Sequence, residues 1–132
     1  MNEIVDLIRS IRKQRKELEN REKEMLKSIC FSDVTVESVK NLFFIEKGID
    51  SFENMEQKKM FIYVCISIIC PTFIIGDRLN YTLRKNLSKH TSIHPVQISY
   101  ISKNVITYYE IYKSFKSEAD YLYNSIKRSL TS

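Results

Sequence analysis

Residues 83–101, LRKNLSKHTSIHPVQISYI, decide the fold, because their apolar spacing predicts two helices that meet at a sharp corner. The first helix has a large and then a small inward side chain, one aliphatic fills the turn, and two aliphatics face inward on the second helix. These positions are Leu87, Ser88, Ile93, Ile98 and Ile101. Pro95 suits the first turn of the second helix, where its fixed φ and missing N–H cost nothing. The pattern predicts a helix-turn-helix, although Ser92 stands where a turn with positive φ would favour Gly or Asn.

The charge around this corner favours a surface that faces nucleic acid. Residues 78–109 contain no Asp or Glu, and their five Lys and Arg side chains equal the formal net charge of the whole chain, +5. Solvated helix faces usually mix signs, whereas a phosphate-binding surface is basic. The alternative is a structural corner in a protein whose lysine content reflects an AT-rich genome.

The residues expected to meet DNA follow from this interpretation. We expect phosphates to be held by Arg78, Arg84, Lys85 and Lys89. The second helix would enter a major groove and contact base edges through Gln97, Ser99, Tyr100 and Lys103.

Length and composition limit the fold to one all-helical domain. The chain has 132 residues, 43% of them hydrophobic, with two glycines and two prolines. One hydrophobic core fits this length, and long periodic stretches with so few helix breakers predict helices throughout. We expect a single domain over residues 1–132, with a long charged helical arm at 1–30. The helix-turn-helix core, with a long C-terminal helix, would occupy 31–132.

Both ends of the chain are predicted to form long helices with heptad patterns. In the N-terminal arm, apolar residues recur every seven positions from Ile4 to Met25, beside a basic cluster within residues 9–16. We interpret this cluster as a solvated face rather than a second phosphate-binding patch. At the other end, apolar residues step by three and four from Ile98 to Ile126, which predicts one helix from about 95 to 129. We expect the two helices to pack on each other, within one chain or between two copies in a homodimer.

Two shorter helices are predicted between the arm and the corner. The first is amphipathic, ends at Gly48 and is capped by Ser32 or Asp33. The second spans about 55–70 after a cap at Asn54, and its sequence is nearly all apolar. Its apolar run is interrupted by a proline and is shorter than the roughly 20 residues that a membrane span needs. We therefore expect a buried central helix and no membrane association.

Catalytic and metal-binding patterns are missing from the sequence. No glycine-rich loop could hold a nucleotide, and no Ser/His/Asp or Cys/His set has supporting context. Cys65, Cys70, His90 and His94 faintly resemble a zinc finger, but the cysteines are five apart in a helix and would be turned about 140° from each other. We expect core thiols, and histidines that hydrogen-bond backbone or phosphate. The sequence therefore predicts no enzyme, no cofactor, no metal site and no small-molecule substrate.

Two segments of the chain resemble small helix-turn-helix proteins carried by phages and mobile elements of Bacteroides-like bacteria. They are CPTFIIGDRLNYTLRKNLSKHTSIHPVQIS at 70–99 and VITYYEIYKSFKSEADYLYNSI at 105–126. The shared features are a Pro–Gly segment before the corner, Leu-Arg opening the first helix, Ile-Ser in the second, and a run of Tyr, Lys and Phe after it. The arrangement is also distantly similar to the C-terminal helical domain of the bacterial replication initiator. The resemblance implies a helical fold and a phage or mobile-element setting.

The cysteines and the N-terminus predict a cytoplasmic protein. Three unevenly spaced cysteines suit a reducing compartment better than a disulfide framework. The first ten residues, MNEIVDLIRS, lack the basic start and long apolar segment of a signal peptide. The compartment expected is that of a bacterium or of a phage-infected cell.

Taken together, the sequence predicts a non-enzymatic DNA-binding protein of phage or mobile-element type, with a helix-turn-helix at about 83–103 that binds double-stranded DNA. The alternative is a protein-interaction or assembly module, either a coiled-coil scaffold or a phage structural component. In that case the long helices would bind each other or a partner. Four side chains off the heptad positions need the core or a partner to cover them: Tyr109, Ile111, Tyr121 and Tyr123.

Overall fold

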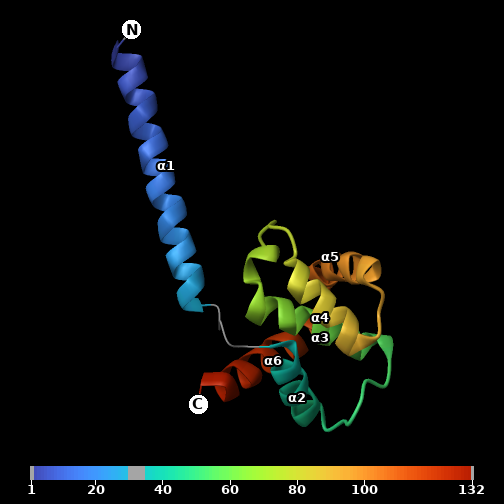
Figure 1. The fold of residues 1–132 in the computed structure, drawn as a ribbon. Coiled ribbons are helices and arrows are strands. Elements are labelled where there is room, and N and C mark those ends of the chain that lie inside the picture. Colours follow the sequence, from blue (N-terminus) through green and yellow to red (C-terminus); the bar gives the residue numbers. More distant parts are fainter. Residues whose placement is uncertain (1, 30–34, 132) are drawn as a thin grey trace. The chain divides into compact units, whose positions relative to one another are not determined.

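The structure, a computed structural model, describes the backbone of residues 2–29 and 35–131 and the side chains of residues 2–22 and 35–131. Every regular element in these residues is a helix and none is a strand, so the expected all-helical class is confirmed. The chain divides into two compact units, Met1–Ser32 and Asp33–Ser132. Helix α1 (Asn2–Ile29) belongs to the first unit, and the remaining helices belong to the second (Figure 1).

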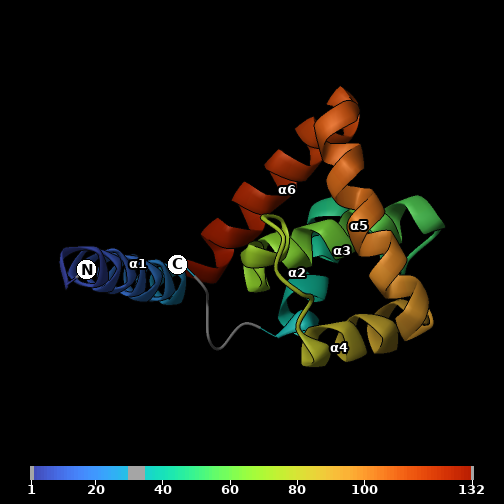
Figure 2. The ribbon, with the colours of Figure 1, turned by 90° about the horizontal axis from the view of Figure 1, so that it is seen from above.

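Helix α3 (Met55–Ile69) is the centre of the second unit. Each residue from 60 to 66 is at most 6% exposed, so the expected buried central helix is confirmed. Four helices pack against it (Figure 2), and they are α2 (Val36–Lys47), α4 (Tyr81–Thr91), α5 (Pro95–Ile111) and α6 (Lys113–Thr131). A short 3-10 turn, η1 (Pro71–Phe73), follows α3. Across residues 2–29 and 35–131, no helix has both the length and the apolar character that crossing a membrane requires.

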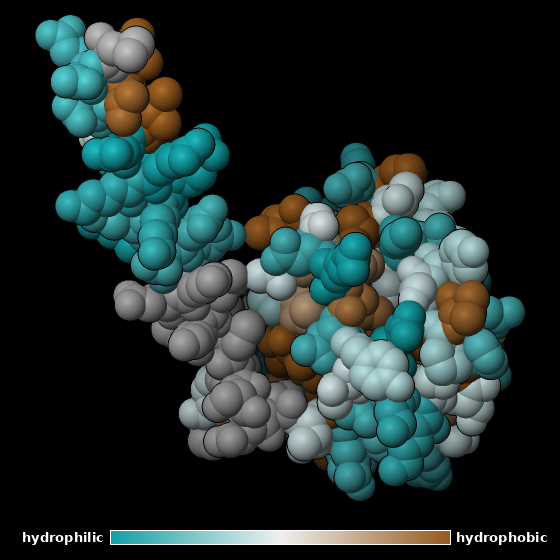
Figure 3. All heavy atoms as spheres, turned by 45° about the horizontal axis from the view of Figure 1, so that its top comes forward, coloured by the Kyte–Doolittle hydropathy of each residue, from teal (hydrophilic) through white to brown (hydrophobic). Residues whose placement is uncertain are grey.

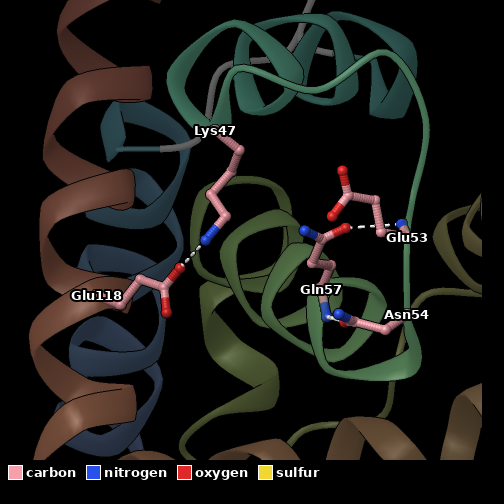
Figure 4. Close-up of polar contacts among 5 residues, drawn as sticks. All are labelled: Lys47, Glu53, Asn54, Gln57 and Glu118. Carbon is pink, nitrogen blue, oxygen red and sulfur yellow. Dashed lines mark hydrogen bonds and ion pairs between the residues drawn. The ribbon is translucent and has the colours of Figure 1, made fainter.

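The start of α3 is fixed by two side chains that hydrogen-bond the backbone. The Asn54 side chain accepts a hydrogen bond from the N–H of Gln57 at 2.8 Å, so Asn54 caps α3 as the sequence predicts. Gln57 in turn accepts from the N–H of Glu53 at 2.7 Å (Figure 4). The first bond satisfies a backbone donor that the first turn of a helix leaves without a partner, and the second ties the residue before the cap to that turn.

Helix α2 ends where the sequence predicts but is capped by a different residue. Gly48 follows its last turn in the left-handed conformation, with φ 66°. The cap is Thr35, whose hydroxyl accepts a hydrogen bond from the N–H of Ser38 at 3.2 Å. The prediction of Ser32 or Asp33 as cap is wrong, because the helix begins later than expected, and both residues lie outside the described part of the chain.

Helices α4 and α5 meet at a corner formed by residues 92–94. Ser92 has φ 60°, and no other non-glycine residue in the described chain has a positive φ. The Ser88 hydroxyl donates to the carbonyl of Ile93, which ties α4 to the turn. The aliphatics expected to face inward are at most 9% exposed, and they are Leu87, Ile93, Ile98 and Ile101.

The prediction of one C-terminal helix from about 95 to 129 is wrong, because the chain breaks at Tyr112. This residue is extended, with φ −98° and ψ 112°, and separates α5 from α6. The break turns α6 back onto α2 and α3, so that α5 and α6 form a V (Figure 2). Ala119, Leu122 and Ile126 are at most 1% exposed as a result. In a straight helix these apolar side chains would be carried away from α3.

Tyr109 links α5 to both α3 and α6 beside the break. Its ring stacks on Tyr63 with 4.9 Å between centroids, and its hydroxyl donates to a carboxylate oxygen of Asp120 at 2.6 Å. This hydrogen bond, together with burial, raises the pKa of Tyr109 to about 12. Tyr109 is therefore partly covered by its contacts with α3 and α6, whereas Ile111 and Tyr121 remain exposed.

Helix α1 forms the first unit by itself, with 28 residues and a length of about 42 Å. Hydrophobic side chains gather on one side of its first half (Figure 3), where Ile4 is 64% exposed and Ile11 is also open. Basic side chains at Arg9 and Lys13 occupy the opposite side, two residues away from Ile11 in each direction. The expected packing of α1 on the C-terminal helices stays a prediction.

Replacing Ser92 by Gly is expected to stabilise the fold by about 0.5 kcal/mol, because Gly adopts a positive φ without steric cost. The matched control is Ser117→Gly, at an exposed position inside α6, where Gly is expected to destabilise by a similar amount. Urea unfolding followed by circular dichroism measures both changes. A Ser92→Gly variant less stable than the wild type would contradict the left-handed conformation at this corner.

Candidate nucleic-acid interface

The side chains predicted to contact DNA all belong to α4, to α5 or to the segment just before α4. Each of them is at least partly exposed, and none forms an ion pair with any residue that the structure describes. We name this set the α4–α5 surface, and its members are Arg78, Arg84, Lys85, Lys89, Gln97, Ser99, Tyr100 and Lys103.

Lys85 and Lys89 lie one turn apart on the solvent side of α4. Their orientation follows from the helix period, because Leu83, Leu87 and Thr91 of the same helix are buried. The Thr91 hydroxyl donates to the carbonyl of Leu87 at 2.6 Å, which satisfies the one polar side chain on the buried side. Because the buried residues occupy the other side of α4, the ammonium groups of Lys85 and Lys89 point to solvent.

The guanidinium of Arg84 is held by partners from both helices. Its Cζ lies 5.6 Å from the centroid of the Tyr81 ring, and its Nη1 donates to Oγ of Ser99 at 3.4 Å. The Ser99 hydroxyl itself donates to the carbonyl of Pro95 at 3.5 Å. The Ser99 hydroxyl therefore has hydrogen-bond partners inside the protein, and it holds the side chain of Arg84, a residue of α4, against α5. A guanidinium has five N–H donors, so most of those on Arg84 remain available to an anion.

The exposed side chains of α5 divide between two flanks of the helix. At about 100° per residue, Lys103 lies about 40° around the axis from Ser99, on the flank that Arg84 contacts. Gln97 lies about 160° from Ser99, on the flank away from α4. Tyr100, which is 66% exposed, points outward between them. The structure thus turns Ser99 and Lys103 toward α4 and Gln97 away from it.

Lys40 of α2 adds a positive charge that the sequence pattern of residues 78–109 does not include. Its Nζ lies 3.1 Å from Nδ1 of His90 on α4, and the ammonium group is the donor. Burial, followed by the charges of Lys40 and Lys89, lowers the pKa of His90, and Glu37 opposes this shift. Lys40 and His90 are 50 positions apart in the sequence, so only the packing of α2 on α4 brings them together.

The cysteine and histidine side chains that resembled a zinc finger serve other purposes. Nδ1 of His94 accepts a hydrogen bond from the N–H of Val96 at 3.1 Å, so His94 caps α5. Cys65 is buried within α3, and burial raises the pKa of its thiol. Searched over the described residues, the chain contains no group of three or more His, Cys, Asp or Glu that could hold a metal ion.

No family model matches this chain, and no curated protein or solved structure matches it either. A function therefore has to follow from the geometry and charge of the α4–α5 surface.

Replacing Lys40 by Met is expected to raise the pKa of His90, because a neighbouring ammonium disfavours the imidazolium form. An NMR titration of the His90 ring protons measures the shift. Lys113→Met, at the start of α6, removes the same charge elsewhere and is expected to leave the pKa of His90 unchanged. An unchanged His90 in the Lys40→Met variant would contradict the contact between α2 and α4.

Proposed function

We propose that this protein is a non-enzymatic DNA-binding protein that uses α4 and α5 as a helix-turn-helix. The observation that carries the proposal is the exposed basic surface at this corner, to which residues 78–109 contribute five Lys and Arg side chains and no carboxylate. Duplex DNA carries a negative charge about every 1.7 Å along its axis, so the side chains of residues 78–109 would approach it without adding like-charge repulsion. The same field speeds association.

The second helix, α5, is the element proposed to enter the major groove. Gln97, Tyr100 and Lys103 are exposed in its first turns, where helix-turn-helix proteins contact base edges. Gln pairs with adenine and Lys with guanine in such grooves. Because Gln97 and Lys103 lie on opposite flanks, they would contact different base pairs, with Tyr100 between them.

Phosphate contacts are proposed for Arg78, Arg84, Lys85 and Lys89. Arg84 is the best prepared of these, because its guanidinium already contacts Tyr81 and Ser99, and these contacts reduce the entropy that it loses on binding. Ser99 acts by holding Arg84 and is not needed as a base contact. The lysines of α4 supply flexible point charges to neighbouring phosphates.

The resemblance to helix-turn-helix proteins of phages and mobile elements supports a phage or mobile-element setting for this function. We therefore propose that the protein binds double-stranded DNA in the cytoplasm of a bacterium or of a phage-infected cell.

The exposed apolar side chains of α1 favour a second function, assembly of two copies through this helix. Ile4 and Leu18 are each 64% exposed, and a single helix cannot bury its own apolar side chains. Pairing two such helices buries both apolar stripes. Assembly is compatible with DNA binding, since helix-turn-helix dimers bind paired half-sites.

The DNA proposal is tested by the salt dependence of binding to a mixed-sequence duplex, measured by fluorescence anisotropy. Four phosphate contacts would make log K fall against log salt concentration with a slope of about −3.6. A Lys85→Ala/Lys89→Ala variant is expected to reduce the slope to about −1.8 and to weaken binding to all sequences alike.

The matched control is Lys113→Ala/Lys116→Ala, which removes the same net charge from exposed positions at the start of α6. Its slope is expected to stay near the wild-type value. Binding that is undetectable, independent of salt, or equally weakened in the two double variants would refute the assignment of phosphate contacts to α4.

Assembly through α1 is tested by size-exclusion chromatography with light scattering. The wild type is expected to be a dimer, and Ile11→Asp is expected to shift it toward monomer by placing a charge in the apolar stripe. Ser10→Asp adds the same charge next to the stripe and is expected to remain dimeric. A monomeric wild type would exclude this mode of assembly.

A further inference from the structure

A cleft lies beside the break at Tyr112, away from the α4–α5 surface. It is bordered by the end of α2, the start of α3, the end of α5 and the start of α6, and its volume is about 540 Å³. Small-molecule sites usually measure about 300–1,000 Å³. The cleft is therefore large enough for a molecule of two fused rings.

Three aromatic rings line this cleft, those of Tyr108, Tyr112 and Phe115. The centroids of Tyr108 and Tyr112 are 5.6 Å apart, with the ring planes at 60°. Phe115 meets the Tyr108 ring edge to face, at 6.0 Å. Neither tyrosine hydroxyl hydrogen-bonds to a described residue. Tilted and edge-to-face rings at these distances are the arrangements in which aromatic groups attract one another, so a further planar ring can join them.

Among the charged side chains that border the cleft, Lys59 is half-buried and has no carboxylate among the described residues as an ion-pair partner. Lys47 and Glu118 form an ion pair across the cleft (Figure 4), so their charges offset each other. Nζ of Lys59 lies 5.4 Å from the centroid of the Tyr108 ring and forms no ion pair with a described residue. Glu56 also borders the cleft, but it is exposed to solvent at the first turn of α3, whereas Lys59 is half-buried.

We propose that the cleft binds a small planar aromatic molecule that carries one acidic group. Its ring would lie against Tyr108, Tyr112 and Phe115, and its acid would meet the ammonium of Lys59. A cationic ligand would be repelled by Lys59, and a non-aromatic acid would lose the contacts with the rings. The site goes beyond the proposed DNA contact, because Tyr108 lies about 17 Å along α5 from Gln97.

The test is a titration of the full chain with 2-naphthoate, followed by NMR signals of the Met60 methyl and of the aromatic rings. We expect shifts at Met60 and at the three ring residues. Lys59→Met is expected to weaken binding about tenfold, the effect of losing one charge-assisted hydrogen bond. The neutral 2-naphthol and the non-aromatic cyclohexanecarboxylate are each expected to bind more weakly than 2-naphthoate.

Lys116→Met is the matched control, because Lys116 also lies over a tyrosine ring, 5.6 Å from the centroid of Tyr109, but does not border the cleft. Its affinity for 2-naphthoate is expected to equal that of the wild type. Tyr112→Ala, at an exposed position, is a second variant expected to weaken binding while the circular dichroism spectrum is kept. The proposal fails if 2-naphthoate shifts no cleft signal, if both lysine variants lose affinity equally, or if 2-naphthol binds as well as 2-naphthoate.

Discussion

Helix α3 must be covered on every side, and this requirement sets the arrangement of the second unit. A helix that is apolar all round is stable in water only when neighbouring elements bury it. Four helices do so here, and residues 60–66 are left at most 6% exposed. The break at Tyr112 follows from the same requirement, because a single straight helix would cover one side of α3, whereas α5 and α6 cover two.

Burying α3 in this way also separates the two surfaces to which functions are proposed. Helix α5 contributes to both, since its first turns carry Gln97 and Tyr100 while its last turns carry Tyr108. The corner at Ser92 turns the basic side chains of α4 and α5 outward, and the break at Tyr112 opens the aromatic cleft. A local backbone feature at each end of α5 therefore determines what that end presents to solvent.

The sequence predicted those parts of the structure whose cause is local. The apolar run of α3, the caps at Asn54 and Gly48, and the corner at Ser92 each depend on a few neighbouring residues. The break at Tyr112 was not predictable, because apolar residues continue to recur every three or four positions through it, without Gly or Pro. Only the packing of α6 on α2 and α3 requires the break. The contact of Lys40 with His90, the support of Arg84 by Ser99, and the cleft all join distant segments, and no local pattern reports such pairs.

The corner of α4 and α5 is the part of the chain proposed to contact DNA. The most direct measurement is a set of backbone amide chemical shifts recorded as ¹⁵N-labelled protein is titrated with duplex DNA. If DNA binds at this corner, the largest changes are expected within residues 84–103, with the amides of α6 little affected. Changes that are largest in α1 or α6, or no changes at all at low salt, would contradict it.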